Sequence, residues 1–317
     1  MALGPTIDGM VDVTAPQRAD IDADRTWQKV LTDGHASLVR ARRLFRYLPS
    51  APRCKVCNNP FGGPAGRLLS VAGFSPSRKN PTLCSRCCDA LPPGGAQVDI
   101  AVLFADVRGS TALGEHASAV DFAALLNRFY ATATRVLLRH DAVIDKLIGD
   151  EVMAFFVRGV SGPDYRRRAV LAGRELLEAV GCGSTGGPWL SVGVAVNAGE
   201  AYVGNVGAAV VDFTALGDPV NVAARMQQHA AGGELIVTSG VADDLMSDAV
   251  PRALTLRGHG RPVDALAAPL WPLPVPLSMF TPDSITKIAR RPPPLRSRMP
   301  HDGHRRRAPA CRCSRRR

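Results

Sequence analysis

The sequence predicts an α+β sandwich of the ferredoxin-like type, preceded by a small helical, cysteine-rich module and followed by a disordered basic tail. Three observations support this fold class. Between residues 96 and 270, strand and helix patterns alternate in the order β-α-β-β-α-β. Two CxxC pairs lie upstream of this region. Downstream, Pro and Arg dominate a segment that has too few apolar residues to offset its ordering entropy.

The first half of the sandwich begins with an apolar, β-branched run over residues 98–105, which predicts a buried strand. Residues 117–139 place apolar side chains on one face of a helix. Two short apolar runs, 142–147 and 151–157, flank a Gly-Asp pair and predict a hairpin.

The second half continues the same alternation. We predict a helix over 163–180, strands over 189–196 and 201–206 joined through 197–200, a helix over 219–229, a strand over 234–237, and a last strand pair over 252–257 and 262–266. The sequence shows no internal repeat.

The N-terminal part is divided by composition. Residues 1–20 lack periodicity, and residues 21–48 have helical spacing that Gly34 weakens and Pro49 ends. We therefore expect a loose segment and helix over 1–49, a cysteine-rich module over 50–95, the sandwich over 96–270 and the Pro/Arg-rich tail over 271–317.

The net charge of +11 belongs almost wholly to the tail. Residues 271–317 hold 12 Lys and Arg against 2 Asp and Glu, so the remaining residues carry only +1. The high pI is therefore no indication of a nucleic-acid-binding core, although the tail itself suits contact with nucleic acid or anionic lipid. No apolar run is long enough to span a membrane, and residues 1–24 lack a signal-like pattern, so we expect a cytoplasmic protein.

Two carboxylates occupy positions that the topology should bring together. Asp106 directly follows the first predicted strand, and Asp150 lies in the predicted hairpin turn. Facing carboxylates repel one another unless cations bind between them, and two hard cations suit phosphoryl chemistry on a triphosphate. The competing interpretation is that Asp106 caps a helix and Asp150 fills a turn.

Four motifs in the same order resemble the catalytic domain of class III nucleotide cyclases. They are VLFADVRGST at 102–111, DKLIGDEVMAFF at 145–156, GEAYVGNVG at 199–207 and FTALGDPVNVAARM at 213–226. The resemblance covers about residues 96–268 and implies the cyclase form of the ferredoxin-like sandwich. It also implies conversion of a nucleoside triphosphate into a cyclic nucleotide and pyrophosphate.

By similarity to the family, Asp106 and Asp150 hold two Mg²⁺ or Mn²⁺ ions. Asn221 orients the ribose, and Arg225 stabilises charge on the transferring phosphoryl group. Arg257 stands where the family has a triphosphate-binding Lys.

Two further residues correspond to the family's base-reading positions. Lys146 stands where Lys marks users of ATP and Glu marks users of GTP, and Thr214 stands where adenylate cyclases carry Asp or Thr. The resemblance therefore implies an adenylate cyclase that produces cyclic AMP for intracellular signalling. It also implies a homodimer, because family sites combine residues from two subunits and this chain holds both sets.

The cysteine pairs are CKVC, with Cys54 and Cys57, and CSRC, with Cys84 and Cys87. Two such pairs suit a tetrahedral Cys₄ zinc site. An iron–sulfur cluster and a module without metal remain alternatives. We expect a structural module that transmits a signal or aids dimerisation, rather than one that binds nucleic acid.

Three other activities remain as alternatives to adenylate cyclase. The first is a guanylate cyclase or one of relaxed specificity, and the second is a degenerate cyclase that senses nucleotides. The third is a diguanylate cyclase, because Gly149-Asp150-Glu151 resembles part of that family's GGDEF signature. Ile148 replaces the signature's first Gly, and NVAAR fits the class III pattern better.

Overall fold

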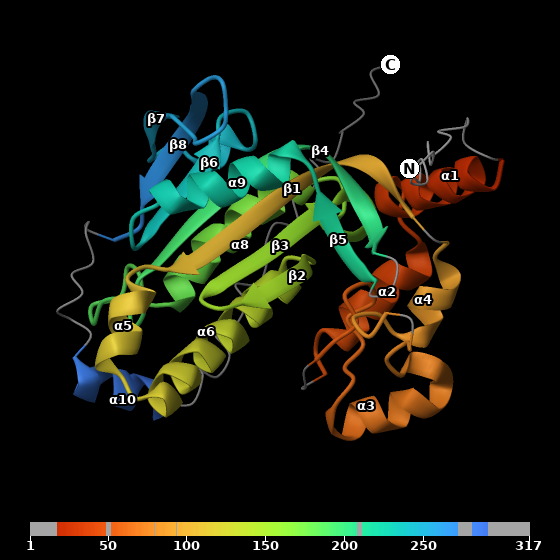
Figure 1. Cartoon of the computed structure of the whole chain (residues 1–317), viewed down its shortest axis with the longest axis horizontal. Coiled ribbons are helices and arrows are strands. Elements are labelled where there is room, and N and C mark those ends of the chain that lie inside the picture. The colour runs from red at the N-terminus through yellow and green to blue at the C-terminus, as the bar shows by residue number, and fades with distance from the viewer. Residues whose placement is uncertain are drawn as a thin grey trace, which may run out of the picture.

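The computed structural model describes residues 18–48, 52–78, 80–92, 94–207, 211–271 and 281–290. Its centre is a twisted sheet in the order β2-β3-β1-β4-β6-β8-β7, with β5 paired to the far end of β4 (Figure 1). The strands are β1 Gly95–Val107, β2 Val143–Ile148, β3 Glu151–Val157, β4 Val192–Val206, β5 Asp212–Leu216, β6 Glu234–Thr238, β7 Val250–Leu254 and β8 Val263–Pro269.

The predicted α+β sandwich is confirmed. Strand β1, helix α6 (Ala119–Arg139), the β2–β3 hairpin, helix α8 (Tyr165–Ala179) and β4 follow one another in the β-α-β-β-α-β order. Strand β1 pairs antiparallel with both β3 and β4 and forms the middle of the sheet. Helix α9 (Asp218–His229) then leads to β6, which lies parallel to β4.

Alternate residues of β1 enter two different cores. Leu103 and Ala105 pack with α6 and α8 on one face of the sheet. Val102 and Phe104 pack on the opposite face, beneath the N-terminal segments and α9. Because side chains alternate along a strand, a continuous apolar run can serve both faces. The run at 98–105 is therefore buried on both sides.

The N-terminal helix pattern breaks where the sequence weakens it. Helix α1 spans Arg18–Thr32 and α2 spans Ala36–Phe45. Between them Gly34 has φ +73, and a Cβ there would lie 2.3 Å from the carbonyl oxygen of Gly159. Only glycine allows this backbone approach.

The cysteine-rich module forms short helices beside α2. These are α3 (Gly63–Leu69), a single π turn at Ser70–Phe74 and α4 (Ser85–Ala90). Figure 1 shows this module and α2 grouped at the end of the sheet where β5 lies. The buried Arg42 of α2 joins the module to the sheet: its guanidinium donates to the carbonyls of Lys55 and Val56, and to those of Asp141 and Ala142 before β2.

Two features differ from the sequence predictions. The strands predicted at 189–196 and 201–206 are one continuous strand, β4, whose first part pairs with β6 and whose last part pairs with β5. Within the tail, Pro282–Arg290 forms helix α10, which packs on α6 through Ile285 and accepts a hydrogen bond from Arg128 at the carbonyl of Ile288. The predictions for residues 1–17, 272–280 and 291–317 lie outside the described residues.

Short helices connect the larger elements: α5 (Ser110–His116) follows β1, α7 (Arg158–Ser161) follows β3, and a 3₁₀ turn at Asp243–Leu245 follows β6. In the described part of the chain, none of the helices combines the length and apolar character needed to cross a bilayer.

Candidate functional site

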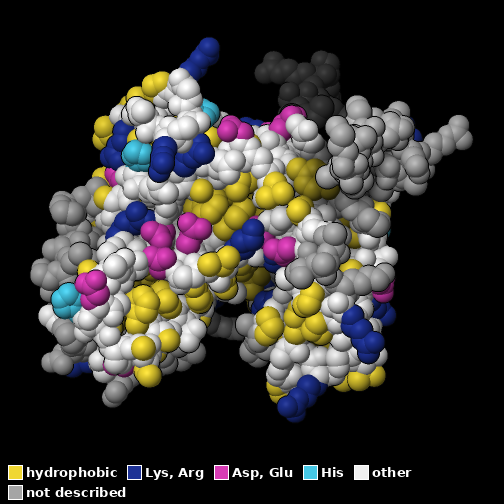
Figure 2. All heavy atoms as spheres, viewed as in Figure 1, with side chains coloured by type: hydrophobic (Ala, Val, Ile, Leu, Met, Phe, Trp, Pro, Cys, Tyr) yellow, Lys and Arg dark blue, Asp and Glu magenta, His cyan; other side chains and the backbone are white. Residues whose placement is uncertain are grey.

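Asp106 and Asp150 lie side by side at the end of the central strand β1, where the β2–β3 turn approaches it. In β1, Asp106 pairs across the ladder with Glu151 of β3, and the backbone N–H of Val107 donates to the carbonyl of Asp150 over 3.2 Å. The β2–β3 turn therefore ends next to the last residues of β1. Figure 2 shows acidic side chains gathered over this end of β1, with basic side chains close by.

A glycine backbone conformation and a hydrogen bond from α6 together fix the turn that carries Asp150. Gly149 has φ +62, a left-handed conformation that favours glycine in the tight hairpin. The Tyr130 hydroxyl of α6 donates a hydrogen bond to the Gly149 carbonyl. The helix that covers one face of the sheet thus also positions the acidic turn.

The site holds two charged residues that sequence reasoning did not select. Glu151 follows Asp150, and burial raises its pKa, with the charges of Asp106 and Asp150 adding to the effect. Arg108 forms an ion pair with Asp106. Their closeness in the sequence to the two aspartates could have indicated both residues, because Arg108 lies two residues beyond Asp106 and Glu151 lies beside Asp150.

The electrostatics of Asp106 indicate an acidic site that lacks enough positive charge. Partial burial raises the pKa of Asp106; Arg108 and Gln227 oppose this shift, and Asp150 adds to it. A raised carboxyl pKa means that the anion is poorly compensated in this environment. The two aspartates offer hard oxygen ligands from two chain segments, so the residues fit Mg²⁺ or Mn²⁺.

Lys146 and Thr214 meet on the opposite face of the β2–β3 hairpin from α6, where β5 approaches β2. Lys146 Nζ lies 3.5 Å from Thr214 Oγ1. Thr214 Oγ1 in turn donates to Asp145 Oδ2 over 2.6 Å. The Thr214 and Asp145 side chains are buried, whereas the Lys146 side chain is 40% exposed.

A bulge in β2 explains how neighbouring residues reach the same threonine. The register with β3 shifts between Ile144 and Lys146, so Asp145 is the inserted residue. Side chains normally alternate between the two faces of a strand, and a bulge suspends that alternation. Asp145 and Lys146 can therefore both contact Thr214. Asp145 was not selected from the sequence, because a local pattern does not reveal a bulge.

Asn221 and Arg225 lie on α9, one helical turn apart, as their spacing predicts. The start of the helix is held by the buried Asn197, which donates to the Pro219 carbonyl over 2.9 Å. The Arg225 guanidinium lies against Gly258, where a Cβ would be 3.6 Å from Nη2. Arg257, next to that glycine, is exposed, so the two arginines share one region.

The predicted site residues thus form three groups in one chain: Asp106 with Asp150, Lys146 with Thr214, and Asn221 and Arg225 with Arg257. Among the described residues, no hydrogen bond or ion pair connects one of these groups to another.

The four predicted cysteine ligands are brought together. The sulfur atoms of Cys54, Cys57, Cys84 and Cys87 all lie within 4.8 Å of one another, and Cys57 and Cys84 are 3.7 Å apart. Tetrahedral zinc with Zn–S bonds of about 2.3 Å requires sulfur atoms about 3.8 Å apart. The geometry therefore fits a single ion. Cys88 lies outside this group of four.

Cys54 and Cys57 lie on a tight turn, and Cys84 and Cys87 lie at the start of α4. Asn58, with φ +62, closes the turn by donating its N–H to the Cys54 carbonyl. Burial opposes ionisation of the Cys54 thiol, but hydrogen bonds from Cys57, Cys84 and Cys87 outweigh burial and lower its pKa well below the usual range. A thiolate is the form that binds metal.

A sequence model of one protein family, described as the adenylate and guanylate cyclase catalytic domain, matches residues 95–259. An uncharacterized protein of Mycobacterium bovis is 31% identical over 185 residues, which cover 56% of this chain and 34% of the relative. An uncharacterized protein of Mycobacterium tuberculosis is 31% identical over 221 residues, which cover 66% of this chain and 37% of that relative. The chain thus spans about a third of the length of these relatives.

Two solved structures are also similar to this chain. The guanylyl cyclase Cya2 has a TM-score of 0.49 at 26% identity, over 55% of this chain and 93% of that one. The adenylyl cyclase CyaB from P. aeruginosa has a TM-score of 0.47 at 27% identity, over 54% and 93%.

Proposed function

Because the chain belongs to the adenylate and guanylate cyclase catalytic domain family, we propose that it converts ATP into 3′,5′-cyclic AMP and pyrophosphate. In this reaction the ribose 3′-oxygen forms a bond to the α-phosphorus and loses its proton. The bond between the α-phosphorus and the oxygen that bridges the α- and β-phosphates breaks, and pyrophosphate leaves with that oxygen. The observation that carries the proposal is the juxtaposition of Asp106 and Asp150 at the end of β1.

In this proposal Asp106 and Asp150 hold two Mg²⁺ or Mn²⁺ ions, which when bound acidify the 3′-hydroxyl and compensate charge on the triphosphate. The ion pair between Asp106 and Arg108 supports this proposal, because it indicates that Asp106 requires a positive charge nearby. Asn221 orients the ribose and Arg225 donates to the oxygens of the transferring phosphoryl group. Arg257, exposed beside Arg225, contacts the triphosphate.

The hydrogen bonds around Thr214 favour adenine. Its hydroxyl proton is committed to Asp145, so Thr214 faces a base as an acceptor. Lys146 has only protons to donate. Adenine offers a matching pair, with an amino group at C6 and an acceptor at N1, whereas guanine presents an acceptor at O6 and a donor at N1.

We propose that two copies of the chain form the complete site. The metal pair would come from one protomer, and Lys146, Thr214, Asn221, Arg225 and Arg257 from its partner. The absence of a hydrogen bond or ion pair between these groups within the described chain supports a shared site, and a symmetric dimer would contain two equivalent sites.

We also propose that Cys54, Cys57, Cys84 and Cys87 bind one Zn²⁺ per chain. Elemental analysis of the purified full-length protein tests this directly. Cys57→Ser should lose the zinc, whereas Cys88→Ser, outside the group of four, should retain it. Iron instead of zinc, or no metal in the wild type, would contradict the assignment.

A product assay tests the reaction itself. ATP and GTP are supplied separately to the full-length protein, with Mn²⁺ and then Mg²⁺, and Asp106→Ala is the control. Cyclic AMP from ATP that is absent in the control supports the proposal. Cyclic GMP alone would indicate the guanylate alternative, and no cyclic product from a zinc-bound dimer would indicate a nucleotide sensor.

A further inference from the structure

We infer that Lys55, a residue of the CKVC turn, is a positioning residue for base recognition: it neutralises Asp145 and so leaves Lys146 free to face the nucleotide. The inference rests on the proposed function, because it concerns regulation of the same base-reading pair. Its consequence is that the cysteine centre controls nucleotide selectivity.

Lys55 connects the cysteine turn to both strands of the base-reading region. Its Nζ lies 2.9 Å from Asp145 Oδ1 on β2 and 2.8 Å from Asp212 Oδ1 on β5, and it donates to the Phe213 carbonyl over 3.0 Å. The Lys55 side chain is only 10% exposed and that of Asp145 is fully buried. A buried carboxylate requires a partner of opposite charge.

Two lysines compete for that carboxylate. Lys55 Nζ lies 2.9 Å from Asp145 Oδ1, whereas Lys146 Nζ lies 3.8 Å from Oδ2 and its side chain is 40% exposed. Because Lys55 already pairs closely with Asp145, Lys146 makes only the longer contact with this carboxylate and keeps part of its side chain exposed. Without Lys55, Lys146 would be the nearest cation to the buried Asp145 and would be drawn inward, away from a base.

The placement of Lys55 depends on both halves of the cysteine group. Lys55 lies between Cys54 and Cys57, and its N–H donates to the carbonyl of Thr82, which precedes Cys84, over 3.0 Å. The Arg42 guanidinium donates to the Lys55 carbonyl over 3.1 Å. A metal bound to all four sulfurs would fix the turn and the 82–84 segment relative to one another.

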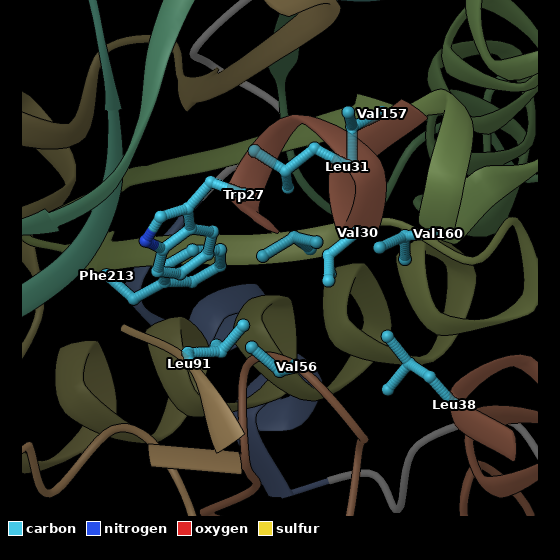
Figure 3. Close-up of a pocket in the computed structure, with 10 residues that line it drawn as sticks. Trp27, Val30, Leu31, Leu38, Val56, Leu91, Val157, Val160 and Phe213 are labelled. Carbon is cyan, nitrogen blue, oxygen red and sulfur yellow. The ribbon is translucent and has the colours of Figure 1, made fainter. Parts of the chain in front are cut away.

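The same segments also clamp β5 through apolar contacts. Trp27 of α1 lies over Phe213, the neighbour of Thr214, and both line a small apolar cavity with Val56 of the cysteine turn (Figure 3). Phe213, the neighbour of Thr214, is thereby held by a polar contact from Lys55 at its carbonyl and by an apolar contact from Trp27 at its ring, and both contacts come from the N-terminal segments. Loss of the metal releases the polar contact by freeing the turn that bears Lys55.

The first test compares Lys55→Met with Arg78→Met, which changes an exposed residue of the same module. Loss of a charged hydrogen bond is expected to lower the ATP-to-GTP ratio of kcat/KM about tenfold in Lys55→Met. Arg78→Met should leave the ratio unchanged. Both variants should keep one zinc per chain, so the effect cannot come from loss of the metal.

The double variant Lys55→Met/Asp145→Asn separates positioning from folding. Asparagine removes the buried charge that attracts Lys146, so the double variant should recover most of the selectivity that Lys55→Met loses. Because the double variant has no unpaired carboxylate at position 145, it also avoids a folding defect from that source. A selectivity ratio equal to that of wild type in Lys55→Met, or no recovery in the double variant, would overturn the inference.

Hydrogen exchange provides a readout that does not depend on catalysis. Amides of β5 should exchange faster in Lys55→Met and after zinc chelation, while amides of β6 should not change. If the wild type makes no cyclic nucleotide, the proposed function fails, yet faster exchange in β5 would still support the positioning role. Unchanged exchange in β5 would overturn it.

Discussion

Trp27 stacks on Phe213, with ring centroids 5.7 Å apart and ring planes inclined by 14°. The contact joins α1 to β5, the strand that carries Thr214, although the two residues are far apart in the sequence. Trp27 is 1% exposed, and its indole N–H donates to the Pro92 carbonyl. One side chain therefore connects the N-terminal helix, the segment before β1 and strand β5.

Trp27→Ala should destabilise the full-length protein by about 3–5 kcal/mol, because truncating a buried tryptophan removes its packing and leaves a cavity. Urea unfolding followed by circular dichroism measures the change. Leu44→Ala, which truncates an exposed side chain of α2, is the matched control and should change the free energy of unfolding little. A loss below about 1 kcal/mol for Trp27→Ala would contradict the packing.

Mixing two inactive variants tests the shared site. Asp106→Ala and Asn221→Ala lack residues from different halves of the proposed site, so a mixed dimer has one intact site and one doubly damaged site. After free exchange of subunits, about a quarter of wild-type activity should return. If exchange is demonstrated with labelled subunits and activity stays at zero, each site is built within one chain.

Lys146→Glu tests base choice at the residue proposed to donate to adenine N1. A carboxylate accepts where the lysine donates, so kcat/KM for ATP should fall and the relative use of GTP should rise. Lys29→Glu makes the same change at an exposed position of α1 and should leave selectivity unaltered. Equal selectivity in the wild type and Lys146→Glu would remove Lys146 from base recognition.

Alkylation at pH 8 tests the described cysteines one by one. Burial raises the pKa of Cys182 to about 11, so roughly one thiol in a thousand is ionised at that pH. Iodoacetamide followed by peptide mass mapping should modify the half-buried Cys88 before Cys182. The four clustered cysteines should react only after a chelator is added. Equal rates for Cys88 and Cys182 would contradict the burial of Cys182.

Most of the sheet could be predicted because its signals are local. The apolar run before Asp106 and the Gly-Asp turn at Asp150 define two strand ends, and the topology places them together. The strand β4 was harder, because its middle residues, 197–200, resemble a turn in composition. Pairing with β1 along its length holds those residues extended.

The region around Lys146 and Thr214 could be predicted only in part. Lys146 and Thr214 were selected from motifs, but the contact of Lys55 with Asp145 joins residues 90 positions apart. No periodicity or spacing encodes such a contact. It depends on the bulge at Asp145 and on the way the cysteine turn packs against β2, both of which arise from tertiary structure. Helix α10 escaped prediction because its few apolar residues lie in a Pro/Arg-rich tail.

The core between the N-terminal segments and the sheet has a consequence for the limits of the folding unit. Sequence similarity to the family begins at residue 95, yet Trp27 and Cys84 share one apolar cluster with Val102 and Phe155. The stretch that matches the family model and the folding unit therefore have different borders. A chain cut at residue 95 would leave an apolar sheet face in water, so the N-terminal segments are expected to unfold together with the sheet in one cooperative transition.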